Sequence, residues 1–111
     1  MKQKDIEKLI YELVKPHGFV REMSIFFMGK DENTICWVSK HGPFWEFNAN
    51  FCRKKSKEVM TGVILHELGH LMCSEHGHGS EWQDIVLNKL HIDPIYAQEL
   101  YKSKSKQNYK Y

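Results

Sequence analysis

The five residues His66-Glu67-Leu68-Gly69-His70 lie inside an apolar stretch and form an HExxH pattern. In an α-helix, two residues four apart are separated by about 40° around the axis and by one turn along it. Both imidazoles can therefore reach one metal ion, and the carboxylate of Glu67 can face a water beside that ion. The pattern predicts a helix that carries two metal ligands and one general base.

Two histidines are too few for a catalytic zinc site, which usually has three protein ligands and an open fourth position. The nearby candidates for a third ligand are Glu75, His76 and His78. His76 has the spacing of the metzincin pattern HExxHxxGxxH, but Cys73 replaces the glycine of that pattern. The metzincins also need a methionine turn downstream, and the last methionine of this chain is Met72. These two departures argue against the metzincin interpretation.

A second pattern, His78-Gly79-Ser80-Glu81-Trp82, follows the first. HELGH followed by His-Gly-x-x-aromatic resembles the SprT-like zinc metalloproteases. The size is similar to that of the related minigluzincins, and the short segment between the motifs resembles WLM-type proteases. The resemblance implies zinc bound by His66, His70 and His78, with Glu67 as general base. His76 stays open as an alternative third ligand.

The same resemblance implies a zinc-dependent endopeptidase, a hydrolase that cuts peptide bonds, with DNA-associated proteins as a substrate class. Zinc lowers the pKa of its bound water toward ~7, and Glu67 would carry the proton from that water to the leaving amine. The strand predicted at residues 44–51 is expected to offer its edge to an extended peptide. Candidates for an oxyanion-stabilising residue are His91, Tyr96 and Tyr101.

The alternative function is a catalytically latent or inactive zinc-bound regulatory protein on the same scaffold. Two features motivate it: the sequence has no recognisable oxyanion-stabilising residue, and residues 102–111 contain four lysines and no acidic residue. This basic segment is expected to be a flexible tail. It could fold over the cleft, as tails do in the minigluzincins, or associate weakly with DNA.

The flanking sequence predicts an α+β fold. Apolar residues at helical spacing predict a helix over residues 3–15, which Pro16 and Gly18 end. Three apolar segments at residues 19–29, 34–39 and 44–51, separated by turn residues, predict a small three-stranded antiparallel sheet. The last of these segments has apolar residues at alternate positions up to residue 51, as expected for one strand face.

The HExxH motif should lie on a long helix over residues 57–75, with Ser56 as N-cap. Gly69 within that helix would permit another element to approach closely. Closing helices follow: Ser80 and Gln83 have the spacing of a capping box, and Asp93 before Pro94 opens a short helix. Trp82 is expected to be a core anchor and not a substrate contact.

Length and composition fit one globular domain, expected over residues 1–101. The chain has 111 residues, 41% of them hydrophobic, and a formal net charge of +2. Four of its seven histidines fall within residues 66–78. No apolar run approaches the ~20 residues of a membrane span, and the first residues lack the apolar block of a signal peptide. A cytoplasmic location is therefore expected.

The three cysteines, Cys36, Cys52 and Cys73, form no CxxC pair. A four-cysteine zinc ribbon is excluded, and one disulfide would leave an odd thiol. We expect three reduced, buried cysteines.

Overall fold

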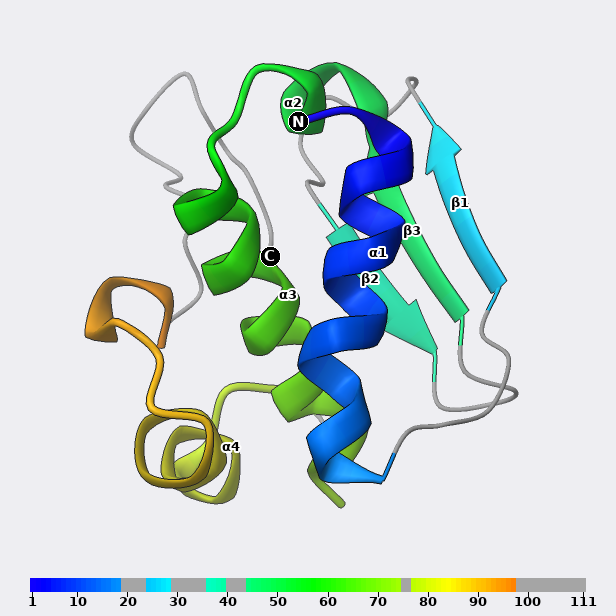
Figure 1. Ribbon diagram of the computed structural model, residues 1–111. Coiled ribbons are helices and arrows are strands. Elements are labelled where there is room, and N and C mark those ends of the chain that lie inside the picture. The colour runs from blue at the N-terminus through cyan, green and yellow to red at the C-terminus, as the bar shows by residue number, and fades with distance from the viewer. Residues whose placement is uncertain (19–23, 29–35, 40–43, 75–76, 98–111) are drawn as a thin grey trace.

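The computed structural model describes residues 1–18, 24–28, 36–39, 44–74 and 77–97, which form an α+β fold (Figure 1). Helix α3 contacts α1 and the sheet, and it also contacts the elements that follow α4. The elements in chain order are α1 (Gln3–Val14), η1 (Lys15–His17), β1 (Ser24–Met28), β2 (Cys36–Ser39), β3 (Phe44–Asn48), α2 (Ala49–Arg53), α3 (Lys57–Met72), α4 (Ser80–Asp84), η2 (Ile85–Lys89) and η3 (Pro94–Tyr96). The N-terminal helix predicted at residues 3–15 is confirmed, whereas residues 102–111 lie outside the described part.

The sheet has three strands, but the prediction that all of them are antiparallel is wrong. Their order is β1-β3-β2, with β2 antiparallel to β3 and β1 parallel to β3. Successive strands do reverse direction, as the predicted turns require. The error lies in the order of neighbours, because β3 inserts between β1 and β2 and so meets β1 in the same direction. Hydrophobic alternation gives a strand its two faces but does not say which strand lies beside it.

The strand predicted at residues 44–51 ends earlier, at Asn48, and the chain turns into the short helix α2. Asn48 is the N-cap of this helix, since its side-chain oxygen accepts a 3.1 Å hydrogen bond from the backbone N–H of Phe51. Trp45 and Phe47 point into the core from the strand, as expected. Phe51 belongs to the helix, so the apolar alternation up to residue 51 was not a strand signal throughout.

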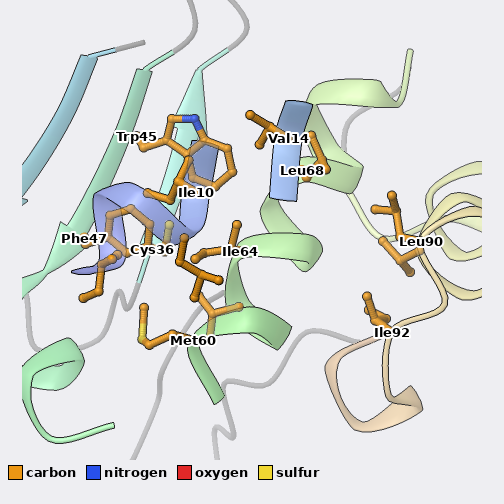
Figure 2. Close-up of a cluster of buried hydrophobic side chains, with 14 of the residues drawn as sticks. Ile10, Val14, Cys36, Trp45, Phe47, Met60, Ile64, Leu68, Leu90 and Ile92 are labelled. Carbon is orange, nitrogen blue, oxygen red and sulfur yellow. The ribbon is translucent and has the colours of Figure 1, made fainter. Parts of the chain in front are cut away.

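Helix α3 is buried on two sides, which fits a sequence whose apolar residues are not confined to one face of the helix. Ser56 is its N-cap, as predicted, and accepts a 3.3 Å hydrogen bond from the N–H of Val59. Figure 2 shows Met60 and Ile64 among the side chains that face the sheet, and Leu90 and Ile92 on the other side of the helix. The helix ends at Met72, three residues before the predicted end. The motif-bearing helix is therefore the central element of the core.

The closing segment begins without the predicted capping box. Gly79 is the N-cap of α4 and makes no side-chain cap, so Ser80 is the first helical residue. Gln83 does not reach back either, because its Nε2 donates a 2.6 Å hydrogen bond to the carbonyl oxygen of Ala97. The cap predicted at Asp93 is confirmed by a 3.1 Å hydrogen bond from the N–H of Ile95.

The three cysteines are free and buried, as predicted. Burial raises the pKa of the Cys52 thiol to about 12, so this cysteine is protonated and unreactive at neutral pH. In the described part of the chain, no helix has the length and apolar character needed to cross a membrane.

Replacing Asn48 with alanine should destabilise the fold by about 1 kcal/mol, because the first turn of α2 loses its cap. Urea unfolding measures this change. Asn50→Ala is the matched control, since Asn50 is exposed on the same helix and accepts only a 3.4 Å hydrogen bond from Arg53. An equal loss in both variants would contradict the capping role.

Candidate metal centre

Three histidine side chains meet beside helix α3. His66 and His70 come from the helix, one turn apart, and His78 comes from the loop that leads into α4. The Nε2 atom of His78 lies 3.1 Å from that of His66 and 3.2 Å from that of His70. All three ligand atoms lie within 4.8 Å of one another. Glu75 and His76, the other candidates for the third ligand, lie outside the described residues.

The spacing of these nitrogen atoms fits one tetrahedral metal ion. Nitrogen ligands about 2.0–2.1 Å from zinc are roughly 3.3 Å apart in a tetrahedron. Nδ1 of His66 lies 2.6 Å from the carbonyl oxygen of Tyr96, which can only accept, so Nδ1 carries the proton. The lone pair of Nε2 therefore faces the other two imidazoles. His66 is fully buried whereas His70 and His78 are half-buried, so solvent reaches the cluster from one side.

The indole of Trp82 forms a platform beneath the three imidazoles. Its ring centroid lies 4.6 Å from those of His66 and His78, and 5.1 Å from that of His70, with which it stacks. Its Nε1 donates a 3.2 Å hydrogen bond to the main-chain carbonyl of His66. Trp82 is fully buried, which confirms that it is a core anchor. The same side chain also limits the positions that all three histidines can take.

Gly69 allows α4 to come this close to α3. A Cβ atom at this position would collide with Val86 and would lie 2.9 Å from Nε1 of Trp82. The glycine costs roughly 1 kcal/mol of helix propensity relative to alanine. The close approach predicted from Gly69 is confirmed.

A second glycine, Gly62, leaves room for Tyr96, whose main-chain carbonyl is bonded to His66. A Cβ atom there would lie 2.5 Å from two ring carbons of Tyr96, so the aromatic ring lies directly against the helix backbone. The carbonyl of this tyrosine is the acceptor for Nδ1 of His66, and the next carbonyl, that of Ala97, accepts from Gln83. Residues 96 and 97 are thus held against both α3 and α4, and a fixed acceptor of this kind orients a metal-binding imidazole.

Glu67 is a buried carboxylate, only 2% exposed, and its Oε1 has no hydrogen-bond partner. Burial raises the pKa of this carboxyl well above its ordinary value. Burial, and after it the negative charge of Glu67, raises the pKa of the Cys36 thiol on β2. A buried polar atom without a partner is rare and marks a position where a water or ion is expected.

Two of the three candidates for an oxyanion-stabilising residue lie in the described part of the chain. His91 and Tyr96 line a surface pocket of about 630 Å³ beside α3, together with Gly62 and Leu65. Tyr96 contributes its main-chain carbonyl to His66, a role that sequence reasoning missed. Tyr101 lies outside the described residues.

Part of the chain matches a known protein in sequence. No family model matches the chain. Over 53 residues, the chain is 36% identical to the protein SprT of Shewanella oneidensis. This alignment covers 43% of the chain and 34% of that protein, so the chain spans about a third of its relative. The chain resembles SprT-like metalloproteases. The resemblance predicted from the two motifs is therefore supported by a direct sequence match.

Two solved structures share the fold of this chain. The metallopeptidase zymogen abylysin of Pyrococcus abyssi superposes with a TM-score of 0.69 at 20% identity, over 94% of this chain and 98% of that one. The metallopeptidase zymogen jannalysin of Methanocaldococcus jannaschii gives 0.61 at 22% identity, over 78% and 82%. The likeness to abylysin therefore extends over nearly the full length of both chains.

Substituting alanine for Gly62 should destabilise the protein by about 1–3 kcal/mol, although helix propensity alone favours alanine. The added methyl group displaces the ring of Tyr96 and, with it, the carbonyl that orients His66, so zinc binding should weaken as well. Urea unfolding of the metal-free protein measures the first effect. In a Tyr96→Ala background the methyl group has room, and there Gly62→Ala should stabilise. A loss of equal size in both backgrounds would refute the steric explanation.

The stability of the metal-free protein should fall as pH rises, because of Glu67. Its pKa in the folded state lies above the ordinary value of 4.5, so the folded chain keeps a proton that the unfolded chain releases. The associated stability is present below the unfolded pKa and is lost as pH rises through the folded pKa. Unfolding free energies measured from about pH 5 to pH 8 should show this decline relative to Glu67→Gln. Glu58→Gln, at an exposed carboxylate on the same helix, is the control variant. A Glu67→Gln curve that runs parallel to the wild-type curve would contradict the effect of burial.

Proposed function

We propose that the chain is a zinc-dependent endopeptidase. The observation that carries the proposal is the convergence of three imidazole Nε2 atoms from one helix and the loop after it. The same helix carries the buried carboxyl of Glu67, next in sequence to His66. Three neutral nitrogen ligands with one open position are typical of catalytic zinc sites, whereas structural zinc sites have four protein ligands. In this proposal His66, His70 and His78 bind the metal, and Glu67 is the catalytic base.

The reaction would be hydrolysis of a peptide bond. A zinc ion held by the three histidines would supply a Lewis acid that polarises the substrate carbonyl and acidifies water. Glu67 accepts a proton from the attacking water, whose oxygen bonds to the carbonyl carbon. Glu67 then gives the proton to the amine nitrogen as the C–N bond breaks. The raised pKa of Glu67 makes its carboxylate a stronger base than that of an exposed glutamate, which suits the first step. It also keeps the protonated form populated closer to neutral pH until the proton is passed to the amine.

An extended peptide would pair with β2. The edge predicted for this role was that of a strand at residues 44–51. In the structure this strand is β3, and both of its edges are paired because it lies between the other two strands. Within the described residues, β2 has β3 on one side only, and it is also the strand that contacts α3. An exposed strand edge offers backbone N–H and C=O groups to an extended peptide chain. In this proposal the substrate peptide therefore pairs with this edge of β2.

DNA-associated proteins are proposed as the substrate class through the likeness to SprT-like proteins alone. The basic segment at residues 102–111, proposed to associate weakly with DNA, lies outside the described residues. Its support is its four lysines without an acidic residue.

A latent or regulatory protein on the same scaffold is the second candidate. The observation that favours it is the burial of Glu67, which a substrate and a water would have to reach. The two solved structures that share the fold are also zymogens. Latency predicts the same metal site as the peptidase proposal but a covered cleft.

Glu67→Gln should reduce cleavage of an unfolded protein substrate by at least about 100-fold while leaving zinc content unchanged, since general acid–base catalysis contributes about 10²–10⁴-fold. The assay compares zinc-loaded wild type and variant, with activity abolished by a chelator and restored by zinc. A variant ending at residue 101 is measured in parallel. Activity only in the shortened chain would favour latency, and zinc-loaded protein inactive in both lengths would refute the peptidase proposal.

A further inference from the structure

The loop that carries His78 is closed by a side chain to which neither motif assigns a role. Helix α3 ends at Met72, Cys73 is already extended, and α4 begins at Ser80. Between them the chain must turn back so that His78 meets two histidines on the helix it has just left. Gly77, with φ of 90°, supplies one of the required turns. The geometry of this loop decides whether the third imidazole is in place.

The ends of this loop are joined by hydrogen bonds between Ser74 and Glu81. The carboxylate oxygen Oε1 of Glu81 accepts a 2.7 Å hydrogen bond from the backbone N–H of Ser74. The hydroxyl of Ser74 lies 2.9 Å from each of the two carboxylate oxygens and donates to them. Hydrogen bonds to an ionised acceptor are shorter and stronger than neutral ones, and the 2.7 Å bond from the backbone N–H is short in this way. The hydroxyl shares its one hydrogen between the two carboxylate oxygens, and those 2.9 Å distances are longer.

Two consecutive side chains of helix α4, Glu81 and Trp82, contact different parts of the loop. Glu81 reaches back to Ser74 at the end of α3, whereas Trp82 points inward and contacts the ring of His78 at 4.6 Å. Glu81 therefore holds the start of the loop at Ser74, and the next residue, Trp82, supports the ring of His78. A displacement of Glu81 from Ser74 would open the loop on the side where His78 enters the metal site.

We propose that Glu81 is a positioning residue for His78, and that its carboxylate holds the loop closed on Ser74 so that the third imidazole stands ready beside His66 and His70. A ligand held in place before the metal arrives loses less conformational freedom on binding. This inference rests on the proposed metal site and extends it to a residue that touches neither metal nor substrate. The competing explanation is that Glu81 only favours the first turn of α4 through the helix dipole.

The test compares zinc affinity in Glu81→Ala, Glu81→Gln and Asp84→Ala, measured by competition with a chromophoric chelator. Glu81→Ala should bind zinc about 10–100-fold more weakly, as expected for loss of a residue that orients a ligand. Glu81→Gln keeps an acceptor for the N–H of Ser74 and should recover most of the affinity. Asp84 is an exposed acid on the same helix, hydrogen-bonded to Asn88, and its replacement should leave affinity unchanged.

The visible spectrum of the cobalt-loaded protein separates positioning from helix stability. Wild type and Asp84→Ala should show the intense bands of four-coordinate cobalt, and Glu81→Ala should show weaker bands as His78 leaves the site. Zinc affinity within about twofold of wild type in Glu81→Ala, or an equal loss in Asp84→Ala, would overturn the proposal. If Glu81→Ala does not fold, Ser74→Ala removes only the hydroxyl and should still weaken zinc binding; unchanged affinity would overturn the proposal.

The outcome is independent of peptide cleavage. A chain that binds zinc through a Glu81-dependent site but cleaves nothing would retain the positioning role and refute the peptidase. If the chain cleaves peptides but Glu81→Ala leaves its zinc affinity unchanged, the peptidase proposal is retained and the positioning role of Glu81 is refuted.

Discussion

The close contact of α4 with α3 at Gly69 is the constraint on which the metal centre depends. The indole of Trp82 lies close to where a side chain at this position would begin, and the same indole contacts all three imidazoles. A methyl group at Gly69 would push the indole away from the helix, and the floor beneath His78 would move with it. The helix therefore gives up roughly 1 kcal/mol of intrinsic propensity at its centre to let a second element form the other half of the site.

The sequence predicted that His66 and His70 lie together, because helix geometry alone relates two residues four apart. The choice of His78 came from the resemblance to SprT-like proteins, since spacing alone left His76 open as the third ligand. The supports of His66 come from farther away. Tyr96 lies thirty residues along the chain, and its carbonyl reaches His66 only because Gly62 leaves space for its ring. Gly62 was visible as a mid-helix glycine, like Gly69, but its partner could not be read from spacing.

Two local patterns failed where tertiary partners were available. Ser80 and Gln83 match a capping box, yet Gln83 bonds to Ala97 and thereby holds the segment that orients His66. The order of the strands failed for the same reason, since the insertion of β3 between its neighbours depends on packing and not on any turn. The alternation around Asn48 predicted a strand, but the side chain of Asn48 caps a helix that the apolar residues alone did not indicate.

The burial of Glu67 connects the stability of the fold with its proposed chemistry. An unpartnered carboxyl in the core is unfavourable for folding, and apolar packing around α3 has to offset it. A carboxylate in water has a pKa too low to be an effective base at neutral pH, and burial raises it toward the range that proton transfer requires. On this helix His66 and Glu67 are both buried, whereas His70 is half-buried, so the site combines a desolvated carboxyl with access for solvent. An exposed glutamate on the same helix would cost the fold less stability, but its carboxylate would be less basic and less suited to carry the proton.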